Sequence, residues 1–321
     1  GEYGVIDGGH AILAPTRRSM HFDIRESHTD KVASRKLGVK RLKASMVPFN
    51  IWKPYTIALA FLKNKHIGKK PFVLTIQSDL ETPAFKLGLG SSGALCTGII
   101  KSILDFHGVK VSSMTLFKLS VLAQYDSSKQ TSFGDLSVHA FGQWVLYRKF
   151  DEQWMRKHEN DALKTLIQRP WKGLKILPFT PPSIYGFAVN SMTPSSSTAL
   201  VQAYRRKVPL QERINLKHFT DQKTLSLHAS LKGTSNWEIL DEIQEAMYWF
   251  SHKQNLSIIT SPLEEISRTL TAFEGNAKFS GAGGGDCVIA FFDSQKHYLQ
   301  AKHHFIDASY LIIEIGGVIR E

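Results

Sequence analysis

Glycine and serine are concentrated in residues 86–94 (KLGLGSSGA), and an apolar stretch of helical length follows at once at residues 95–106. The three glycines lack a Cβ, so the backbone can approach an anion closely and can adopt positive φ. A turn of this kind presents free backbone N–H groups at the start of a helix, where they and the helix dipole together attract anions. The segment therefore predicts a phosphate-binding turn.

The two serines of this turn leave a second interpretation open. Ser91 and Ser92 carry hydroxyls that could cap the helix, contact a phosphate or bind Mg²⁺. A tight turn with a serine cap needs no ligand, but the segment is denser in glycine and serine than a cap requires. No lysine follows the last glycine, so it is not a Walker loop, and the glycine spacing does not fit the dinucleotide fingerprint.

A second glycine-rich turn occupies residues 280–286 (SGAGGGD), between a helix expected to end near Glu274 and an apolar strand expected from Cys287. Each of its three consecutive glycines destabilises regular structure by roughly 1 kcal/mol relative to alanine, so we expect a function that requires them. The alternative is a flexible, hairpin-like connector. Two such turns in one chain favour two walls of a single phosphate-bearing cleft.

Strands and helices alternate around these turns. We expect strands within residues 11–24 and at 71–77, 142–150, 183–190, 287–292 and 311–315. We expect helices at residues 52–62 (with Pro54 in the first turn), 95–106, 114–124, 153–171 and 197–206, several between 215 and 273, and one at 294–305. The pattern indicates an α/β or α+β body with a domain boundary at residues 178–182 (PFTPP).

Composition excludes several classes of protein. Of the 321 residues 42% are hydrophobic and 21% charged, which argues against extensive disorder, and no apolar run approaches the roughly 18 residues of a membrane helix. Cys96 and Cys287 lie in apolar sequence, so we expect buried free thiols and a reducing, cytoplasmic location. The chain opens without Met and without a cationic and apolar leader, so we expect no signal peptide.

The net charge of +12 admits polyanionic ligands such as nucleic acid, anionic membrane or phosphorylated small molecules. The densest basic runs are residues 31–43 and 63–70. A nucleic-acid patch is one interpretation of the first run, but no recognised nucleic-acid module surrounds it, and lysines also protect exposed strand edges. The second run lies where a helix should end, and cations there complement the helix dipole. We therefore favour a solvated loop and strand edge for the first run and a solvated helix end for the second, and we expect neither nucleic-acid nor membrane binding.

The two glycine-rich turns together resemble those of the GHMP kinase superfamily. Its phosphate-loop motif is similar to residues 86–94, and its C-terminal glycine motif is similar to residues 278–287 (KFSGAGGGDC). Further segments are similar in the family's order: residues 1–5 (GEYGV), 132–136 (SFGDL) leading into 142–144 (GQW), and 194–201 (PSSSTALV). The GGGDC ending and residues 194–201 resemble the phosphomevalonate kinases within the superfamily.

The resemblance implies an α+β GHMP kinase fold, with a ribosomal-protein-S5-like N-terminal domain (residues 1–181) and a ferredoxin-like C-terminal domain (residues 182–321). It implies ATP with Mg²⁺ and (R)-5-phosphomevalonate as substrates, meeting between the domains to give 5-diphosphomevalonate and ADP in the mevalonate pathway of isoprenoid biosynthesis. We expect a monomer or homodimer. Phosphoryl transfer depends mostly on positioning and charge neutralisation, which backbone N–H groups, Mg²⁺ and cations supply.

The resemblance also assigns residues. Asp135 would be catalytic, orienting groups or helping to arrange the metal and lysine charges, and Ser92 would contribute a hydroxyl to Mg²⁺. The ATP-binding residues would be Lys86, Gly88, Leu89, Gly90, Ser91, Ser92 and Gly93. The substrate-binding residues would be Lys101, Ser132, Ser196, Ser197, Thr198, Gly281, Gly283, Gly284, Gly285 and Asp286. For Lys101, a solvated helix lysine is an equal alternative.

The chain departs from the family pattern at two points. Family members carry a lysine in a strand just before the Gly-Glu-Tyr segment, thought to neutralise the transferring phosphate, and we expect such a strand to precede Gly1 in the natural polypeptide. Mevalonate-type members carry a metal-binding Glu on the helix before the catalytic Asp, where this chain reads AQYDS (residues 123–127). Mevalonate kinase and a catalytically inactive small-molecule sensor on the same fold are therefore the alternatives.

Overall fold

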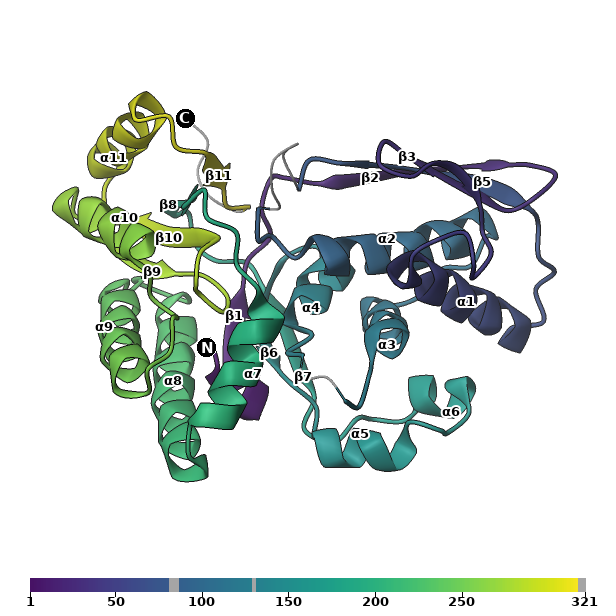
Figure 1. Ribbon diagram of the computed structural model, residues 1–321, viewed down its shortest axis with the longest axis horizontal. Helices are drawn as coiled ribbons and strands as arrows, with labels where there is room; N and C mark the ends of the chain where they lie inside the picture. Colours follow the sequence, from purple (N-terminus) through teal and green to yellow (C-terminus); the bar gives the residue numbers. More distant parts are fainter. Residues whose placement is uncertain (81–86, 129–130, 317–321) are drawn as a thin grey trace.

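The computed structural model describes residues 1–80, 87–128 and 131–316, which form a mixed α+β fold in two halves (Figure 1). The first half contains a three-stranded antiparallel sheet in the order β1-β6-β7 and a four-stranded sheet in the order β2-β5-β3-β4. The strands of the first sheet are β1 (His10–Leu13), β6 (Trp144–Arg148) and β7 (Lys175–Phe179). Those of the second are β2 (Met20–Glu26), β3 (Lys31–Ser34), β4 (Gly38–Arg41) and β5 (Phe72–Ser78).

Four helices fill the space below the four-stranded sheet. They are α1 (Phe49–Asn64), α2 (Ser91–Phe106), α3 (Ser113–Gln124) and α4 (Gly134–Phe141), and Figure 1 shows the sheet covering α1 and α2 with α3 and α4 beyond them. Helix α2 is central, because Ile99, Ile100, Ile103 and Leu104 are fully buried. The 3₁₀ turn η1 (Gly4–Asp7) and the short helices α5 (Glu152–His158) and α6 (Leu163–Gln168) complete this half.

The second half is one antiparallel sheet with helices packed around it. Its strands are β8 (Tyr185–Asn190), β9 (Asn276–Phe279), β10 (Cys287–Phe292) and β11 (Ile312–Glu314). The spatial order β11-β8-β10-β9 places the fourth strand beside the first and the third beside the second, as in ferredoxin-like folds. The helices are α7 (Ser197–Lys207), α8 (Leu210–Ser230), α9 (Glu238–Lys253), α10 (Ser261–Ala272) and α11 (Gln295–Asp307).

The structure confirms most of the expected elements and corrects others. Helix α1 begins at Phe49, so Pro54 lies in its second turn rather than the first and cannot donate to the Asn50 carbonyl. The single helix expected at residues 153–171 is two short helices, α5 and α6, separated by a turn. Strands β7 and β9 are not among the expected elements. Strands β3 and β4 lie in residues 31–43, where the sequence indicates a solvated loop and strand edge without separate strand bounds.

Both cysteines are buried and unpaired, as expected. Burial raises the pKa of the Cys96 thiol, and it raises that of Cys287 to about 12, so neither thiol is activated. Within the described residues, none of the helices combines the length and the apolar character that crossing a membrane would take.

Candidate active site

A cavity of about 700 Å³ lies between the two halves, and both glycine-rich turns reach it. Its lining includes Gly88, Leu89 and Gly90 from the first turn and Gly281 and Asp286 from the second. The other predicted site residues in the lining are Ser132, Asp135, Ser197 and Thr198. Segments nearly 200 residues apart in sequence are thus brought to one cavity.

The first glycine-rich turn leads into helix α2 in the way that the sequence suggests. Gly88 has a φ of +71° and Gly90 a φ of +70°, a conformation that favours glycine. Gly90 is the N-cap of α2, and no side chain caps this helix end. The serine-cap interpretation is therefore wrong: Ser91 and Ser92 are the first two helical residues, and the Ser92 side chain is at the exposed surface.

Asp135 lies directly against this turn. It is in the first turn of α4, and a Cβ added to Gly93 would overlap its carboxylate, while one added to Gly90 would lie 3.0 Å from the Asp135 Cβ. Burial raises the pKa of Asp135 and outweighs the opposing effect of the nearby His139. A carboxyl group therefore lies against the start of helix α2.

The second turn connects β9 to β10 and is rigidly held from both sides. Gly283, Gly284 and Gly285 all have positive φ, and a Cβ on Gly283 or Gly285 would overlap the carbonyl of Ile258 or Thr193, respectively. The Gly284 N–H donates to the Ile258 carbonyl at 2.6 Å. The turn does connect two antiparallel strands as a hairpin would, but these glycines support a packed loop rather than a flexible one.

Asp286 ends this turn and joins three segments. Its Oδ1 accepts a hydrogen bond from the Ser195 N–H at 3.3 Å, and its own N–H donates to the Thr193 carbonyl at 2.9 Å. A Cβ on Gly88 would overlap the Asp286 carboxylate. Burial raises the pKa of Asp286, with the Ser195 N–H opposing this effect. The two glycine-rich turns therefore touch at Gly88 and Asp286.

Residues 194–201 bring a second helix N-terminus to the cavity. Ser196 is the N-cap of α7, and its Oγ accepts a hydrogen bond from the Ala199 N–H at 3.3 Å. Ser197 and Thr198 in the first turn of α7 line the cavity with exposed side chains. The Ser195 hydroxyl donates to the Gly283 carbonyl at 2.5 Å, which ties this helix start to the second glycine-rich turn.

The remaining predicted residues are placed as follows. Lys86 falls outside the described residues. Ser91, Ser92, Gly93, Ser196, Gly283, Gly284 and Gly285 adjoin the cavity lining through their neighbours without being part of it. The structure does not bring Lys101 to the site: its side chain is exposed on α2 and pairs with Asp105 at 2.5 Å, one helical turn away. Its solvated alternative is therefore correct.

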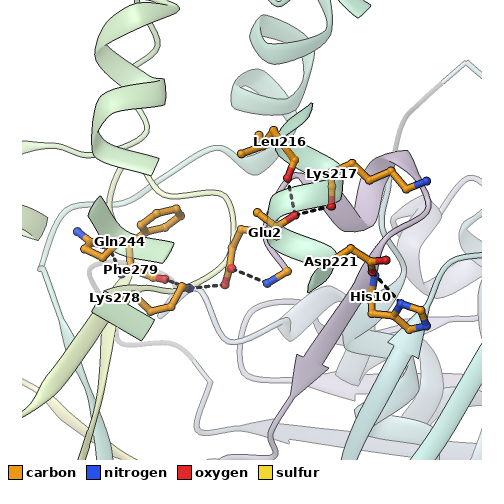
Figure 2. A network of polar contacts seen from close by, with 10 residues as sticks. Glu2, His10, Leu216, Lys217, Asp221, Gln244, Lys278 and Phe279 are labelled. Carbon is orange, nitrogen blue, oxygen red and sulfur yellow. Dashed lines mark hydrogen bonds and ion pairs between the residues drawn. The ribbon is translucent and has the colours of Figure 1, made fainter. Parts of the chain in front are cut away.

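Sequence reasoning missed an ion pair deep in the cavity (Figure 2). Lys278 is 2% exposed, and its Nζ lies 2.6 Å from Glu2 Oε1. Burial alone would raise the pKa of Glu2, but the Lys278 ammonium and the α-amino group of Gly1, 3.0 Å from Glu2 Oε2, together outweigh it and hold this pKa well below its usual range. Both residues stand inside motifs that the sequence contained, but no pattern indicates that they pair across 276 positions.

The metal-binding expectation can be tested against the oxygen donors at the site. The described residues contain no cluster of three or more His, Cys, Asp and Glu side chains that could hold a metal. Asp135 supplies a hard oxygen ligand beside the turn, whereas the exposed Ser92 side chain lies outside the cavity lining. Mg²⁺ typically keeps several waters while binding one or two protein groups and the phosphates of its substrate. The residues fit such a metal–nucleotide complex.

Comparisons with known proteins agree with this architecture. Residues 52–143 match the family described as "GHMP kinases N terminal domain", and residues 235–307 match "GHMP kinases C terminal", together about half of the chain. A Streptomyces phosphomevalonate kinase is 27% identical over 69% of this chain and 61% of its own length. The chain therefore spans less than two thirds of that relative.

Two further proteins are similar along nearly the whole chain. A Methanocaldococcus jannaschii mevalonate kinase is 22% identical over 92% of this chain and 89% of its own length. The Streptococcus pneumoniae phosphomevalonate kinase in complex with phosphomevalonate and AMPPNP has a TM-score of 0.86 and 24% identity, covering 98% of this chain and 96% of that one. With both family domains matched around one glycine-lined cavity, the chain belongs to the GHMP kinase superfamily.

Proposed function

We propose that this chain transfers the γ-phosphoryl group of ATP to the phosphate of (R)-5-phosphomevalonate, giving 5-diphosphomevalonate and ADP. One observation carries the proposal: two helix N-termini, those of α2 and α7, meet a single cavity with serine or threonine in the first turn of each. Each supplies free N–H groups and the positive end of a helix dipole. A reaction between two phosphate-bearing substrates uses both.

The α2 end suits the nucleotide. Gly88 and Gly90 let the backbone approach the triphosphate, and the uncapped first turn leaves its N–H groups free for phosphate oxygens. The Asp135 carboxylate beside the turn, with the Ser92 hydroxyl at the start of α2, would hold Mg²⁺ together with the phosphates. Bound there, Mg²⁺ neutralises charge on the transferring group.

The α7 end suits the acceptor. Ser197 and Thr198 offer hydroxyls and backbone N–H groups to its phosphate, and Ser132 lies across the same cavity. The packed loop at Gly281–Gly285 covers the reacting groups and excludes water. Because an acceptor phosphate is already ionised at neutral pH, the site needs no strong general base, and Asp135 orients groups instead.

A coupled assay of ADP release tests the proposal, with phosphomevalonate, mevalonate and no acceptor run in parallel. The proposal expects ADP release with phosphomevalonate that exceeds both other reactions by at least 100-fold. Equal or greater release with mevalonate would overturn the assignment of acceptor and support a mevalonate kinase. This second candidate is favoured by the similarity to the mevalonate kinase over 92% of the chain.

Binding measurements on the same protein preparation distinguish an enzyme from an inactive sensor. Tight binding of ATP or phosphomevalonate, without ADP release in any reaction, would contradict the proposed catalysis and support the sensor. Calorimetry with each ligand supplies this measurement.

A further inference from the structure

Two carbonyl groups, one at the end of the phosphate-binding turn and one in the first turn of α2, are each contacted by a side-chain amide or imidazole from a neighbouring helix. His139 Nε2, on α4, lies 3.2 Å from the Gly90 carbonyl oxygen. Gln124 Nε2, on the last turn of α3, donates to the Ser92 carbonyl oxygen at 3.1 Å. Carbonyl oxygens repel phosphate, whereas N–H groups attract it, so the orientation of these peptide groups decides what the turn can bind.

His139 is placed to act on the turn from the catalytic side. It lies four residues after Asp135, so the two side chains project from the same face of α4, and both line the cavity. A Cβ on Gly93 would lie 3.2 Å from the His139 ring, and one on Gly90 would lie 3.4 Å from its Nε2. The ring is therefore packed against the turn, and its Nε2 contacts the turn's backbone.

This contact fixes the hydrogen-bonding role of the ring. A carbonyl oxygen only accepts, so Nε2 must carry the proton that it donates to Gly90. The same oxygen also accepts from the Ala94 N–H at 3.0 Å, the first hydrogen bond of α2. The Gly90 carbonyl oxygen therefore has one donor from α2, the Ala94 N–H, and one from α4, the His139 Nε2–H. Together these two donors keep the carbonyl directed into α2.

We propose that His139, assisted by Gln124, is a positioning residue that fixes the peptide groups of the phosphate-binding turn for nucleotide binding. The inference rests on the proposed function only in that the turn binds ATP. It does not depend on which acceptor is used. Gly90 has a φ of +70° and no side chain, so nothing else in the residue itself restricts its peptide groups.

Three substitutions at one position test the donated hydrogen bond. In His139→Gln, the amide nitrogen can take the place of Nε2; in His139→Asn the nitrogen is about one bond too short; and His139→Leu has no donor. We expect His139→Gln to retain most of the affinity for AMPPNP measured by calorimetry. We expect His139→Asn and His139→Leu to bind it about three- to tenfold more weakly, the range of one lost hydrogen bond.

Steady-state kinetics add a readout that a merely structural role would not move. The KM for ATP should rise in His139→Asn and His139→Leu, while the KM for the acceptor stays within twofold. Equal AMPPNP affinity in all three variants and the wild type would overturn the inference, as would equal weakening in the Gln and Leu variants. Gln124→Leu, tested alongside, should weaken AMPPNP binding in the same direction.

The outcome is separable from that of the proposed function. AMPPNP binding needs no acceptor, so the variants rank in the predicted order even if phosphomevalonate proves not to be the substrate. A wild-type chain that does not bind AMPPNP would overturn both proposals. Thermal unfolding of each variant identifies those that fail to fold, and the polar pair His139→Gln and His139→Asn then carries the comparison.

Discussion

At the scale of single residues, the site is built by carboxylates packed against glycines. Asp286 occupies the space that a side chain at Gly88 would need, and Asp135 does the same at Gly93. At each of these positions glycine is therefore required for steric reasons as well as for any conformational freedom, because a side chain would overlap the carboxylate. The close approach is also what brings two acidic groups, one from each half, to the first glycine-rich turn.

Gly88→Ala tests this packing. The alanine must adopt a φ near +71°, which costs about 1–2 kcal/mol, and its Cβ overlaps the Asp286 carboxylate. We expect at least a tenfold loss of kcat/KM for ATP. Gly108→Ala is the matched control, because Gly108 has a φ of +73° with no atom within 4 Å of an added Cβ. It should lower stability by about the same 1–2 kcal/mol, from backbone strain alone, and leave kinetics unchanged. Similar kinetic losses in both variants would contradict the packing argument.

The buried pair of Lys278 and Glu2 gives a stability prediction. Glu2→Gln leaves the Lys278 ammonium buried without its counter-ion, which should lower the free energy of unfolding by about 3 kcal/mol. Replacing both residues, as Glu2→Gln with Lys278→Met, removes the uncompensated charge and should recover most of the loss. Urea denaturation of the three proteins measures this. A double variant no more stable than Glu2→Gln alone would show that the ion pair is not the cause.

At the scale of elements, η1, β1 and α8 tie the start of the chain to the second half. His10, at the start of β1, donates its backbone N–H to Asp221 Oδ1 on α8 at 2.6 Å, and its Nδ1 lies 2.7 Å from the same oxygen (Figure 2). Burial alone would raise the pKa of Asp221, but the hydrogen bonds from His10 outweigh it and lower this pKa. The carboxylate is therefore preferred in the folded state.

This contact predicts a dependence of stability on acid. A folded-state pKa below the unfolded value contributes stability above about pH 4, and the contribution is lost as the pH falls through the folded pKa. The wild type should therefore lose more unfolding free energy than Asp221→Asn between pH 5 and pH 3, as measured by urea denaturation. An identical acid dependence in the two proteins would exclude Asp221 as the titrating group.

The predictability of the elements followed their length and pattern. The 16-residue helix α2 and the alternating strand β5 have enough residues for a period to show, and both were predicted. Strand β9 has four residues and was missed, and β4 is exposed along its length, so neither has a hydrophobic period. The two glycine-rich turns could be predicted because the conformational freedom of glycine is a property of the residues themselves and shows in a short stretch of sequence. The pairs His139–Gly90 and Lys278–Glu2 could not, because only the tertiary fold brings them together.

At the scale of the whole molecule, the cavity lies at the boundary between two halves, each of which has its own sheet or sheets. Strand β7 ends at Phe179 in one sheet and β8 begins at Tyr185 in another, and we propose the domain boundary between them, at residues 181 and 182. Hydrogen bonds join the two halves at this boundary. Tyr3 Oη donates to the Ala282 carbonyl at 2.7 Å, and Trp144 Nε1 donates to the Gly316 carbonyl at 2.6 Å. The substrates would bind where these halves meet.

The net charge of +12 is distributed so that its densest run avoids the cavity. Residues 31–43 contain the β3–β4 hairpin, on the outer sheet, and none of them lines the cavity (Figure 1). Arg18 does line it, and none of the described acidic residues is within ion-pair distance of its guanidinium, whereas the adjacent Arg17 pairs with Glu314 at 2.9 Å. We therefore expect the Arg18 charge to act on an anionic substrate in the cavity.

The two adjacent arginines make a matched test. Arg18→Gln removes a charge from the cavity and should raise the KM for an anionic substrate about fivefold, whereas Arg17→Gln should leave both KM values within twofold. The same coupled assay at low and high salt should show a weaker salt dependence for Arg18→Gln than for the wild type. Equal KM values in the two variants would show that the Arg18 charge does not contribute to electrostatic attraction of the substrate into the cavity.

The central claim is that two anion sites at one cavity hold ATP and phosphomevalonate while the γ-phosphoryl group is transferred from the first to the phosphate of the second. It is tested most directly by ³¹P NMR of the products. The chain is incubated with ATP, Mg²⁺ and phosphomevalonate, and the spectrum is followed over time. The account predicts that the phosphomonoester signal of phosphomevalonate is replaced by the two coupled doublets of a diphosphate as ADP accumulates. Nucleotide hydrolysis that leaves the phosphomonoester signal intact, or a new phosphomonoester formed from mevalonate alone, would contradict it.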